Sequence, residues 1–197
     1  TAISPDEWLA HPGSVGRPVL GAVHILDDAG RELPPGEPGL VYFAGGPRFE
    51  YFKDPEKTAA AYNDRGWSTL GDIGYVDGDG YLYLTDRSSH MIISGGVNIY
   101  PREVEDVLYR HPAVAEAAVI GVPDDRWGEK VMALVHLKPE KTLAEEAIVL
   151  HCQKRLAKYK CPKSIVFVGT LPRTPSGKIQ KNVLREPYWK GLSRRVN

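Results

Sequence analysis

The sequence predicts an α+β protein whose first part is rich in strands and whose second part alternates strands with helices. Its composition, with 42% apolar and 25% charged residues, is typical of a globular protein that buries a core. Up to residue 86, short apolar runs are separated by turns of Gly, Pro and Asp, which is the pattern of β structure. From about residue 88, apolar runs alternate with helix-start patterns, which indicates a compact α+β domain.

The first part contains four predicted strands and one predicted helix. The predicted strands are Val19–Leu26, Gly39–Phe43, Trp67–Val76 and Tyr81–Thr85. The last two flank Asp77–Gly80, whose Asp and Gly residues predict a hairpin turn. A short helix is predicted over Asp54–Tyr62, because Asp54 can cap its start and Pro55 suits its first position.

The second part contains five predicted strands and three predicted helices. The predicted strands are Met91–Ser94, Asn98–Tyr100, Ala113–Val122, Lys130–Leu137 and Ile165–Val168. The first helix is Pro101–Arg110, with Val104, Val107 and Leu108 on one face. Thr142 and Glu145 form a capping-box pattern that predicts a helix running to about Lys158, and Gln180–Arg185 predicts a last helical turn or two.

The boundary between the two parts is predicted near Arg87, Ser88 and Ser89, which gives domains of residues 1–86 and 87–197. Two serines in an otherwise patterned region permit a hinge. Turns of this composition are also common inside domains.

The charges are divided unevenly along the chain. From residue 151 onward there are 12 basic residues and a single acid, Glu186, whereas residues 1–150 hold 13 basic and 24 acidic ones. Such a split suggests that the C-terminal part faces a polyanion such as nucleotide phosphates. A solvated basic tail is the alternative.

Several classes of protein are excluded or disfavoured by composition. No apolar run approaches the roughly 18–20 residues of a membrane span, and the first residues lack the pattern of a signal peptide. Cys152 and Cys161 make no disulfide framework, so we predict a cytoplasmic location. The six histidines show no paired metal-ligand spacing, so we expect no structural metal. The missing initial Met leads us to expect a piece of a longer chain.

Two apparent motifs fail on inspection. Gly177 and Lys178 do not form a phosphate loop, because Ile179 stands where the loop needs a metal-binding hydroxyl. The run Asp77–Gly80 is not a calcium loop, because its twelfth position is Ser88 and not a glutamate.

Four segments, read together, resemble the adenylate-forming enzymes, specifically acyl-CoA synthetases of the fatty-acyl-CoA ligase type. They are Gly66–Asp72, Thr85–Glu105, Val122–Glu129 and Pro172–Lys181. Their order and spacing match the family over essentially the whole chain. The resemblance implies that the second part is the mobile cap domain of such an enzyme. The first part would be the β-rich end, a distorted barrel, of its large N-terminal domain.

The resemblance also implies roles in nucleotide binding. Asp72 resembles the carboxylate that accepts hydrogen bonds from the ATP ribose, a task that suits an acceptor-only group. Arg87 resembles a second ribose contact, and Asn98 belongs to the same nucleotide-binding set. Without the surrounding motifs, Asp72 could equally cap a turn and Arg87 could be a surface arginine.

Lys178 resembles the catalytic lysine that reaches the α-phosphate and the substrate carboxylate during adenylation. Negative charge rises in that transition state, so an ammonium group placed there lowers the barrier. Only its position after Pro172–Gly177 distinguishes it from an ordinary exposed lysine.

The resemblance implies a CoA site as well. Ser94, Gly95 and Gly96 resemble the lining of the pantetheine tunnel, where a Cβ would obstruct a thin thiol arm. Trp127 occupies a position where relatives contact the CoA nucleotide, although it could instead be a packing residue. Tyr159 and Lys160 occupy two further such positions.

The sequence departs from the family pattern at two of these positions. Ser89 stands where relatives often carry Asp or Lys as the hinge, so the usual charge contacts would be missing. Cys161 stands where some relatives have a basic residue for the CoA phosphate, a contact that could pass to Lys160 or Lys163.

The resemblance finally implies the reaction and its limits. A carboxylic acid, presumed fatty, would react with ATP and CoA to give acyl-CoA, AMP and pyrophosphate, with Mg²⁺ accompanying ATP. No nucleic acid is implied, and the phosphate loop, adenine site and acyl tunnel would lie in a large domain before Thr1. The isolated chain is therefore expected to be inactive. An adenylation domain that loads a carrier protein and a non-catalytic interaction module are the alternatives.

Overall fold

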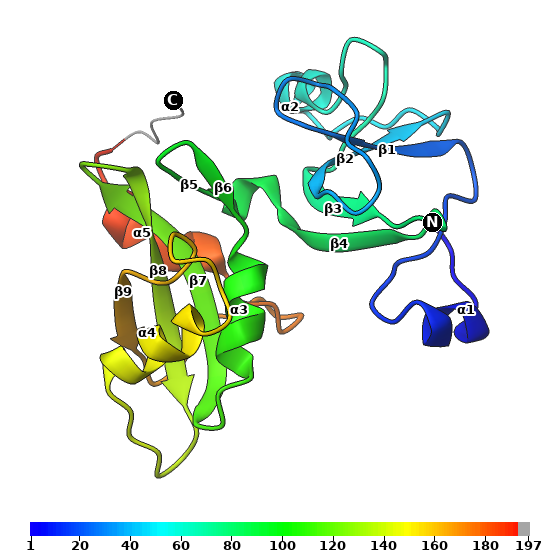
Figure 1. Ribbon diagram of the computed structural model, residues 1–197. Helices are drawn as coiled ribbons and strands as arrows, with labels where there is room; N and C mark the ends of the chain where they lie inside the picture. Colours follow the sequence, from blue (N-terminus) through cyan, green and yellow to red (C-terminus); the bar gives the residue numbers. More distant parts are fainter. Residues whose placement is uncertain (193–197) are drawn as a thin grey trace. The chain divides into compact units, whose positions relative to one another are not determined.

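A computed structural model describes residues 1–192 of the chain (Figure 1). The chain divides into two compact units, Thr1–Ser89 and His90–Asn197. Each described unit contains a sheet and short helices, so the predicted mixture of α and β structure is confirmed.

The first unit is built on an antiparallel sheet with the strand order β1-β2-β3-β4. Its elements are α1 (Pro5–Ala10), β1 (Ala22–Leu26), β2 (Gly39–Ala44), α2 (Pro55–Ala60), β3 (Asp72–Val76) and β4 (Leu82–Arg87). Ile25, Val41 and Leu82 form its small buried core. Within residues 1–89 no pairing of β1 with β4 closes the sheet, so the expected distorted barrel is here an open sheet.

The hairpin of β3 and β4 forms around Asp77–Gly80, as predicted. Asp77 Oδ1 accepts hydrogen bonds from the amides of Asp79 and Tyr81, at 3.0 and 2.9 Å. Gly80 takes a φ of +84°, which a glycine adopts without steric cost. This turn sets the register as far as Gly74 and Leu84. A β-bulge between Ile73 and Gly74 then shifts the pairing by one residue and places Asp72 opposite Arg87.

Two predicted strands begin later than the sequence pattern indicates. β1 starts at Ala22 and not at Val19, because Gly21 has a φ of +69° and its Cα packs against the carbonyl of Ala44. β3 starts at Asp72 and not at Trp67, because Gly71 has a φ of +78°. In each case a left-handed glycine interrupts the extended run.

The helix α1 was not predicted, although its start carries a strong signal. Ser4 accepts a hydrogen bond from the Glu7 amide, and the Glu7 carboxylate accepts one from the Ser4 amide at 2.8 Å. Hydrogen bonds to the Glu7 carboxylate from the amide and hydroxyl of Ser4 and from the Tyr81 hydroxyl lower the pKa of Glu7 to about 2. This reciprocal arrangement is a capping box, with Pro5 at the first helical position.

The second unit is built on a five-stranded sheet in the order β6-β5-β8-β7, with β9 parallel to β8. A short 3₁₀ turn, η1 (Ser88–His90), precedes it. Its elements are β5 (Ile92–Ser94), β6 (Val97–Ile99), α3 (Pro101–Tyr109), β7 (Val114–Asp124), β8 (Gly128–Leu137), α4 (Glu145–Gln153), β9 (Ser164–Phe167) and α5 (Lys181–Trp189).

Both faces of the β7–β8 hairpin are covered, which explains why its strands are almost continuously apolar. Val119 and its face pack with α3 and α4, through residues such as Val104 and Ile148. Ile120 and the opposite face pack against Leu171 and the residues leading into α5. Figure 1 shows α3 and α4 on one side of the sheet and α5 on the other.

Two helix predictions in this unit were wrong in detail. α4 is capped by Ala144 with no side-chain hydrogen bond, so Thr142 and Glu145 do not form a capping box. The helix ends at Gln153, well before Lys158, because the chain turns so that Leu156 can pack on the core. Tertiary packing thus overrides local propensity. α5 is longer than predicted and accommodates Pro187 near its end.

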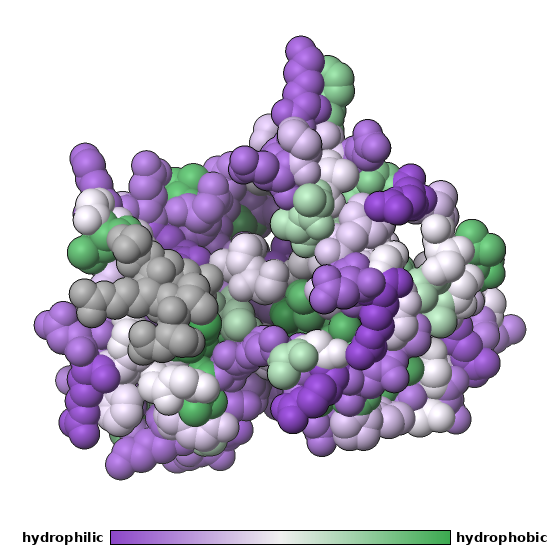
Figure 2. Space-filling view, turned by 90° about the horizontal axis from the view of Figure 1, so that it is seen from above, coloured by the Kyte–Doolittle hydropathy of each residue, from purple (hydrophilic) through white to green (hydrophobic). Residues whose placement is uncertain are grey.

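The surface is mostly hydrophilic, with apolar side chains exposed in scattered places (Figure 2). No helix within residues 1–192 is both long and apolar enough to cross a membrane.

Candidate functional site

Asp72 and Arg87 are brought together at one end of the β3–β4 hairpin. They are directly opposite in the strand register, and Arg87 Nε lies 3.1 Å from Asp72 Oδ1. The preceding turn is fixed by Thr69, whose hydroxyl accepts a hydrogen bond from the Gly71 amide at 3.0 Å. The Asp72 side chain is mostly buried and that of Arg87 is mostly exposed. The pair therefore presents one acceptor and one cation at the same corner.

Lys178 lies at the tip of a tight loop between β9 and α5. Thr174 closes this loop, because its amide donates to the Lys178 carbonyl at 2.8 Å and its hydroxyl accepts from the Lys178 amide at 3.1 Å. Gly177, with a φ of +84°, makes the turn possible. The Lys178 side chain is exposed, and no acceptor in residues 1–192 bonds to its ammonium group. The loop backbone is therefore fixed, while the Lys178 ammonium group remains accessible to a ligand.

The base of this loop is anchored on the sheet. Leu171 and Ile179 pack against the apolar face of β7 and β8. Arg173 donates hydrogen bonds to the Gly177 carbonyl and to the carboxylate of Glu116, near the start of β7.

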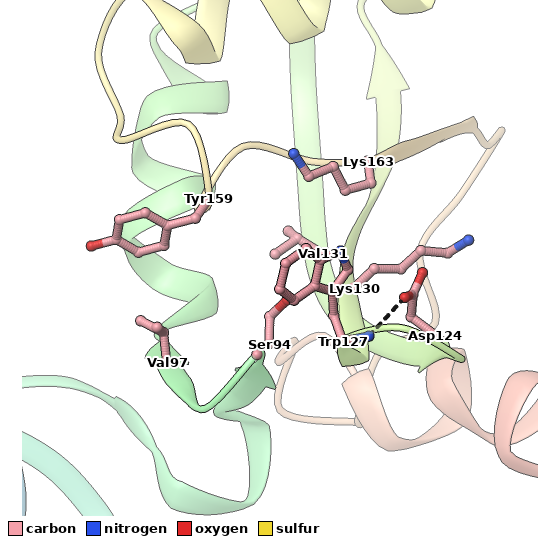
Figure 3. Close-up of a pocket in the computed structure, with 9 residues that line it drawn as sticks. Ser94, Val97, Asp124, Trp127, Lys130, Val131, Tyr159 and Lys163 are labelled. Atoms are coloured by element: carbon pink, nitrogen blue, oxygen red, sulfur yellow. Dashed lines mark hydrogen bonds between the residues drawn. The ribbon is translucent and has the colours of Figure 1, made fainter.

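A cavity of about 530 Å³ opens in the second unit, at the turn end of the β7–β8 hairpin (Figure 3). Four of the residues predicted for CoA line it, namely Ser94, Gly95, Trp127 and Tyr159. The remaining lining residues are Val97, Asp124, Lys130, Val131 and Lys163. The cavity thus combines two aromatic rings with two ammonium groups.

Gly95 and Trp127 form the tightest part of the cavity wall. The Gly95 amide donates to the Trp127 carbonyl at 2.8 Å, and Gly95 has a φ of +59°. A Cβ on Gly95 would lie 2.7 Å from the Trp127 ring, so a side chain is excluded there. Gly96 is also left-handed, at +78°, but a Cβ would meet nothing within 4 Å. It forms the turn and does not line the cavity.

The indole of Trp127 is held by its own loop. Asp124 accepts hydrogen bonds from the amides of Arg126 and Trp127, at 3.1 and 3.0 Å. The Arg126 guanidinium lies 4.7 Å from the indole centroid, a cation–π contact. About half of the Trp127 side-chain surface remains exposed, which leaves a face for a planar group.

Two residues near Tyr159 differ from the expectation. Lys160 points to Glu103 of α3, with Nζ–O distances of 2.7 and 2.8 Å, and it does not line the cavity. Cys161 is buried, and burial raises the pKa of its thiol, so it offers no charge. Lys163 lines the cavity in its place, with its Nζ 3.5 Å from the Lys158 carbonyl oxygen, and Figure 3 shows it above the Trp127 ring.

Asn98 lies on β6, opposite Ile93 and beside the turn of Gly95 and Gly96. It does not line the cavity. Sequence reasoning missed Lys130 and Asp124, although both lie within or next to the segment Val122–Glu129 that it singled out. An Asp that accepts hydrogen bonds from the amides two and three residues later is a turn signal that could have identified Asp124.

The Lys178 loop and the cavity lie toward opposite ends of the β7–β8 hairpin. The loop is tied to Glu116, whereas the cavity begins at Asp124, eight residues further along β7. At 3.2–3.4 Å per residue this is roughly 26 Å. Within the cavity lining, Val131 packs with α3 and α4, whereas Ile179 of the Lys178 loop packs on the other face of the hairpin.

One group in the described part of the chain could hold a metal ion, formed by His11, Asp77 and Asp79. His11 Nδ1 lies 3.2 Å from Asp77 Oδ2, and its ring stacks on Tyr81 at 3.7 Å. Burial opposes ionisation of Asp77, but the amides of Tyr81 and Asp79 outweigh it and lower the pKa. These contacts explain the group as an anchor between α1 and the β3–β4 turn, and we assign no metal to it.

The family profile described as AMP-binding enzyme C-terminal domain matches residues 103–178. Residues 103–178 therefore belong to the C-terminal domain family of the AMP-binding, adenylate-forming enzymes. Long-chain-fatty-acid–CoA ligase FadD13 of Mycobacterium tuberculosis is 43% identical over 95% of this chain and 37% of its own length. An octahydroindenyl-propanoyl:CoA ligase of Rhodococcus jostii is 50% identical over 87% of this chain and 32% of its own length.

Solved structures of similar proteins also match this chain. The ATP-bound structure of MatB from Rhodopseudomonas palustris matches with a TM-score of 0.83 and 39% identity, over 92% of this chain and 37% of that one. The chain thus spans about a third of the length of the relatives that it matches.

Proposed function

We propose that the chain is the C-terminal portion of an ATP-dependent acyl-CoA ligase that works in two half-reactions. The observation that carries the proposal is the separation of the two candidate sites within the second unit. An exposed lysine on an anchored loop suits one step, and a cavity with aromatic and cationic walls, toward the other end of the hairpin, suits another. The family and the CoA ligases among its relatives support the same reaction.

In the first half-reaction, a carboxylate oxygen attacks the α-phosphorus of ATP and the bond to the pyrophosphate oxygen breaks. Two anions approach each other, so the transition state gains negative charge. Lys178 is the proposed catalytic group, because its ammonium carries no competing partner in the described chain. Asp72 would accept hydrogen bonds from the ribose hydroxyls, and Arg87 would contact the same sugar. Asn98 stays a proposed nucleotide contact.

In the second half-reaction, the CoA sulfur attacks the acyl carbonyl, the acyl–phosphate bond breaks and AMP leaves. The pantetheine arm would pass the turn of Ser94, Gly95 and Gly96, where Gly95 leaves the cavity wall without a side chain. The adenine would stack on Trp127 or Tyr159, and Lys163 would neutralise phosphate charge. Lys160 is a weaker candidate, because Glu103 already engages it.

Domain rotation would connect the two steps. Residues 87–197 would turn as a cap about Ser88 and Ser89, which lie at the end of the first unit. Such closure also excludes water, which would otherwise hydrolyse the adenylate. The remaining large domain would supply the ATP phosphate loop, the acyl tunnel and the ligands of Mg²⁺.

The acid is proposed to be a fatty acid, following the relative FadD13. The Rhodococcus relative is named for a bicyclic acid, so a polycyclic carboxylate is the alternative substrate. A cytoplasmic location is proposed because both cysteines are free and buried.

The test uses the full-length protein with ATP, CoA and panels of fatty and bicyclic acids. We expect AMP release and thioester formation that both depend on the acid. AMP release that requires a phosphopantetheine-bearing carrier protein in place of CoA would favour the carrier-loading alternative. No AMP release with any acid would contradict the proposal.

A further inference from the structure

Glu129 is a carboxylate buried almost completely inside the second unit, with 2% of its surface exposed. It is the second residue of β8 and ends the segment Val122–Glu129, where none of the roles above includes it. A buried charge is costly unless it is hydrogen-bonded, so its contacts indicate what it does.

The carboxylate supports the strand that leads into the glycine turn. The Ile93 amide donates to Glu129 Oε2 at 3.3 Å. β5 pairs with β8 only at Ser94 and Gly128, and the next bond joins the Gly95 amide to the Trp127 carbonyl. Where β5 separates from β8, the Glu129 carboxylate therefore replaces a backbone carbonyl as the acceptor for the Ile93 amide.

The neighbouring strand leaves room for this carboxylate. A Cβ on Gly121 of β7 would lie 2.2 Å from Glu129 Oε2. Gly121 has no left-handed φ, so the space itself accounts for the glycine. Its carbonyl accepts a hydrogen bond from Trp189 Nε1 at 3.0 Å, which fixes the backbone from the side of α5.

We infer that Glu129 is a positioning residue, which holds the turn of Ser94, Gly95 and Gly96 against Trp127. This inference rests on the proposed function of the cavity in thioester formation. A shift of about 1 Å in such a turn would misalign the thiol, and misplacement of that size costs up to about 10²-fold in rate.

The first test compares two substitutions in the full-length enzyme. Glu129→Ala removes the acceptor and should slow thioester formation from supplied acyl-adenylate by roughly 10- to 100-fold, with adenylation changed far less. Glu129→Gln keeps an acceptor oxygen of the same reach and should recover most of the rate. An equal loss in both half-reactions, or a glutamine variant as slow as the alanine one, would overturn the inference.

A second test couples Glu129 to Gly121. Gly121→Ala alone should mimic Glu129→Ala, because its methyl group displaces the carboxylate. In the Glu129→Ala background the same change should add little, since the obstructing oxygen has gone. Losses that simply multiply would show that the two residues act independently and would contradict the inference.

A third measurement separates this inference from the proposed reaction. Amide hydrogen exchange at Ile93, Ser94 and Gly95 should accelerate in Glu129→Ala and not in Glu129→Gln. The matched control is Glu105→Ala, another buried glutamate, which accepts the Val119 amide at 2.7 Å. That variant should expose Val119 and leave Ile93 protected.

A wild-type enzyme that makes no thioester would refute the proposed function, while the exchange at Ile93 would still decide the role of Glu129. Unchanged exchange at Ile93 in Glu129→Ala would overturn the inference even in an active ligase.

Discussion

The two candidate sites of the second unit are built in opposite ways. The loop that carries Lys178 fixes its backbone through Thr174 and Arg173 and leaves one side chain exposed. The cavity does the reverse, because Gly95 contributes backbone only and Trp127 lies against it. A site that depends on one charged group should be sensitive to its removal. A site that depends on absent side chains should be sensitive to additions.

The largest effect is expected from Lys178→Ala, which tests the first half of this comparison. Loss of one electrostatic donor to a developing charge typically costs about 2.7–4 kcal/mol, or 10²–10³ in rate. Adenylation, followed as pyrophosphate release by the full-length enzyme, should fall by this factor. Thioester formation from supplied acyl-adenylate should be nearly unchanged.

Lys190→Ala is the matched control, because it removes another exposed lysine from the same C-terminal segment. Equal loss of both half-reactions in the Lys178 variant would mean that the two sites do not have separate roles.

An intermediate effect is expected from Gly95→Ala, with Gly96→Ala as its matched control. Both glycines are left-handed, so each alanine variant carries a backbone cost of about 1–2 kcal/mol. Only at Gly95 does the new methyl group also meet the Trp127 ring. The Gly95 variant should therefore lose more stability and more thioester formation, measured by urea unfolding and by the half-reaction assay.

Combining Gly95→Ala with Trp127→Ala should restore part of the lost stability, because the clash disappears. If Gly95→Ala and Gly96→Ala behave alike, the contact with Trp127 has no consequence for the site.

The sequence predicted most elements that have strong local signals, α1 excepted, and missed the boundaries that tertiary contacts set. The hairpin around Asp77–Gly80 forms as predicted, since Asp and Gly determine such a turn locally. The end of α4 at Gln153 could not be predicted, because it depends on Leu156 packing on a distant core. The late starts of β1 and β3 depend on the left-handed conformations of Gly21 and Gly71. The sequence pattern does not reveal these conformations, because a glycine can also occur inside a strand.

The candidate site was predicted to a similar extent. Motif resemblance selected Trp127 and Tyr159, and both line the cavity. It could not show that Lys160 pairs with Glu103 while Lys163 reaches the cavity, because side-chain direction depends on the loop after α4. The buried position of Glu129 likewise follows from the missing side chain of Gly121, on another strand.

The smallest effect is expected from His111, which lies between α3 and β7 and contacts α4. Its substitution should not affect the Lys178 loop. His111 Nδ1 accepts the Ala113 amide at 3.2 Å, and its ring lies 4.9 Å from that of His151 in α4. Burial, followed by His151 and Arg155, lowers the pKa of His111 from its ordinary value. Protonation is thus easier in the unfolded chain, so the contribution of His111 to stability is complete above its unfolded-state pKa and is lost as the pH falls toward its lowered folded-state pKa.

His111→Asn keeps an oxygen that can accept the Ala113 amide but cannot titrate. Its urea midpoint should change less between pH 7.5 and 5.5 than that of the wild type. A comparison at pH 8, where His111 is neutral in both states, isolates any packing loss. Adenylation by the folded variant should stay at the wild-type rate. If thioester formation in the wild type falls at acid pH because His111 is protonated, that fall should be smaller in the variant. If the stability of the variant depends on pH as that of the wild type does, other groups cause the pH dependence, and the contact of His111 with His151 of α4 does not contribute to it.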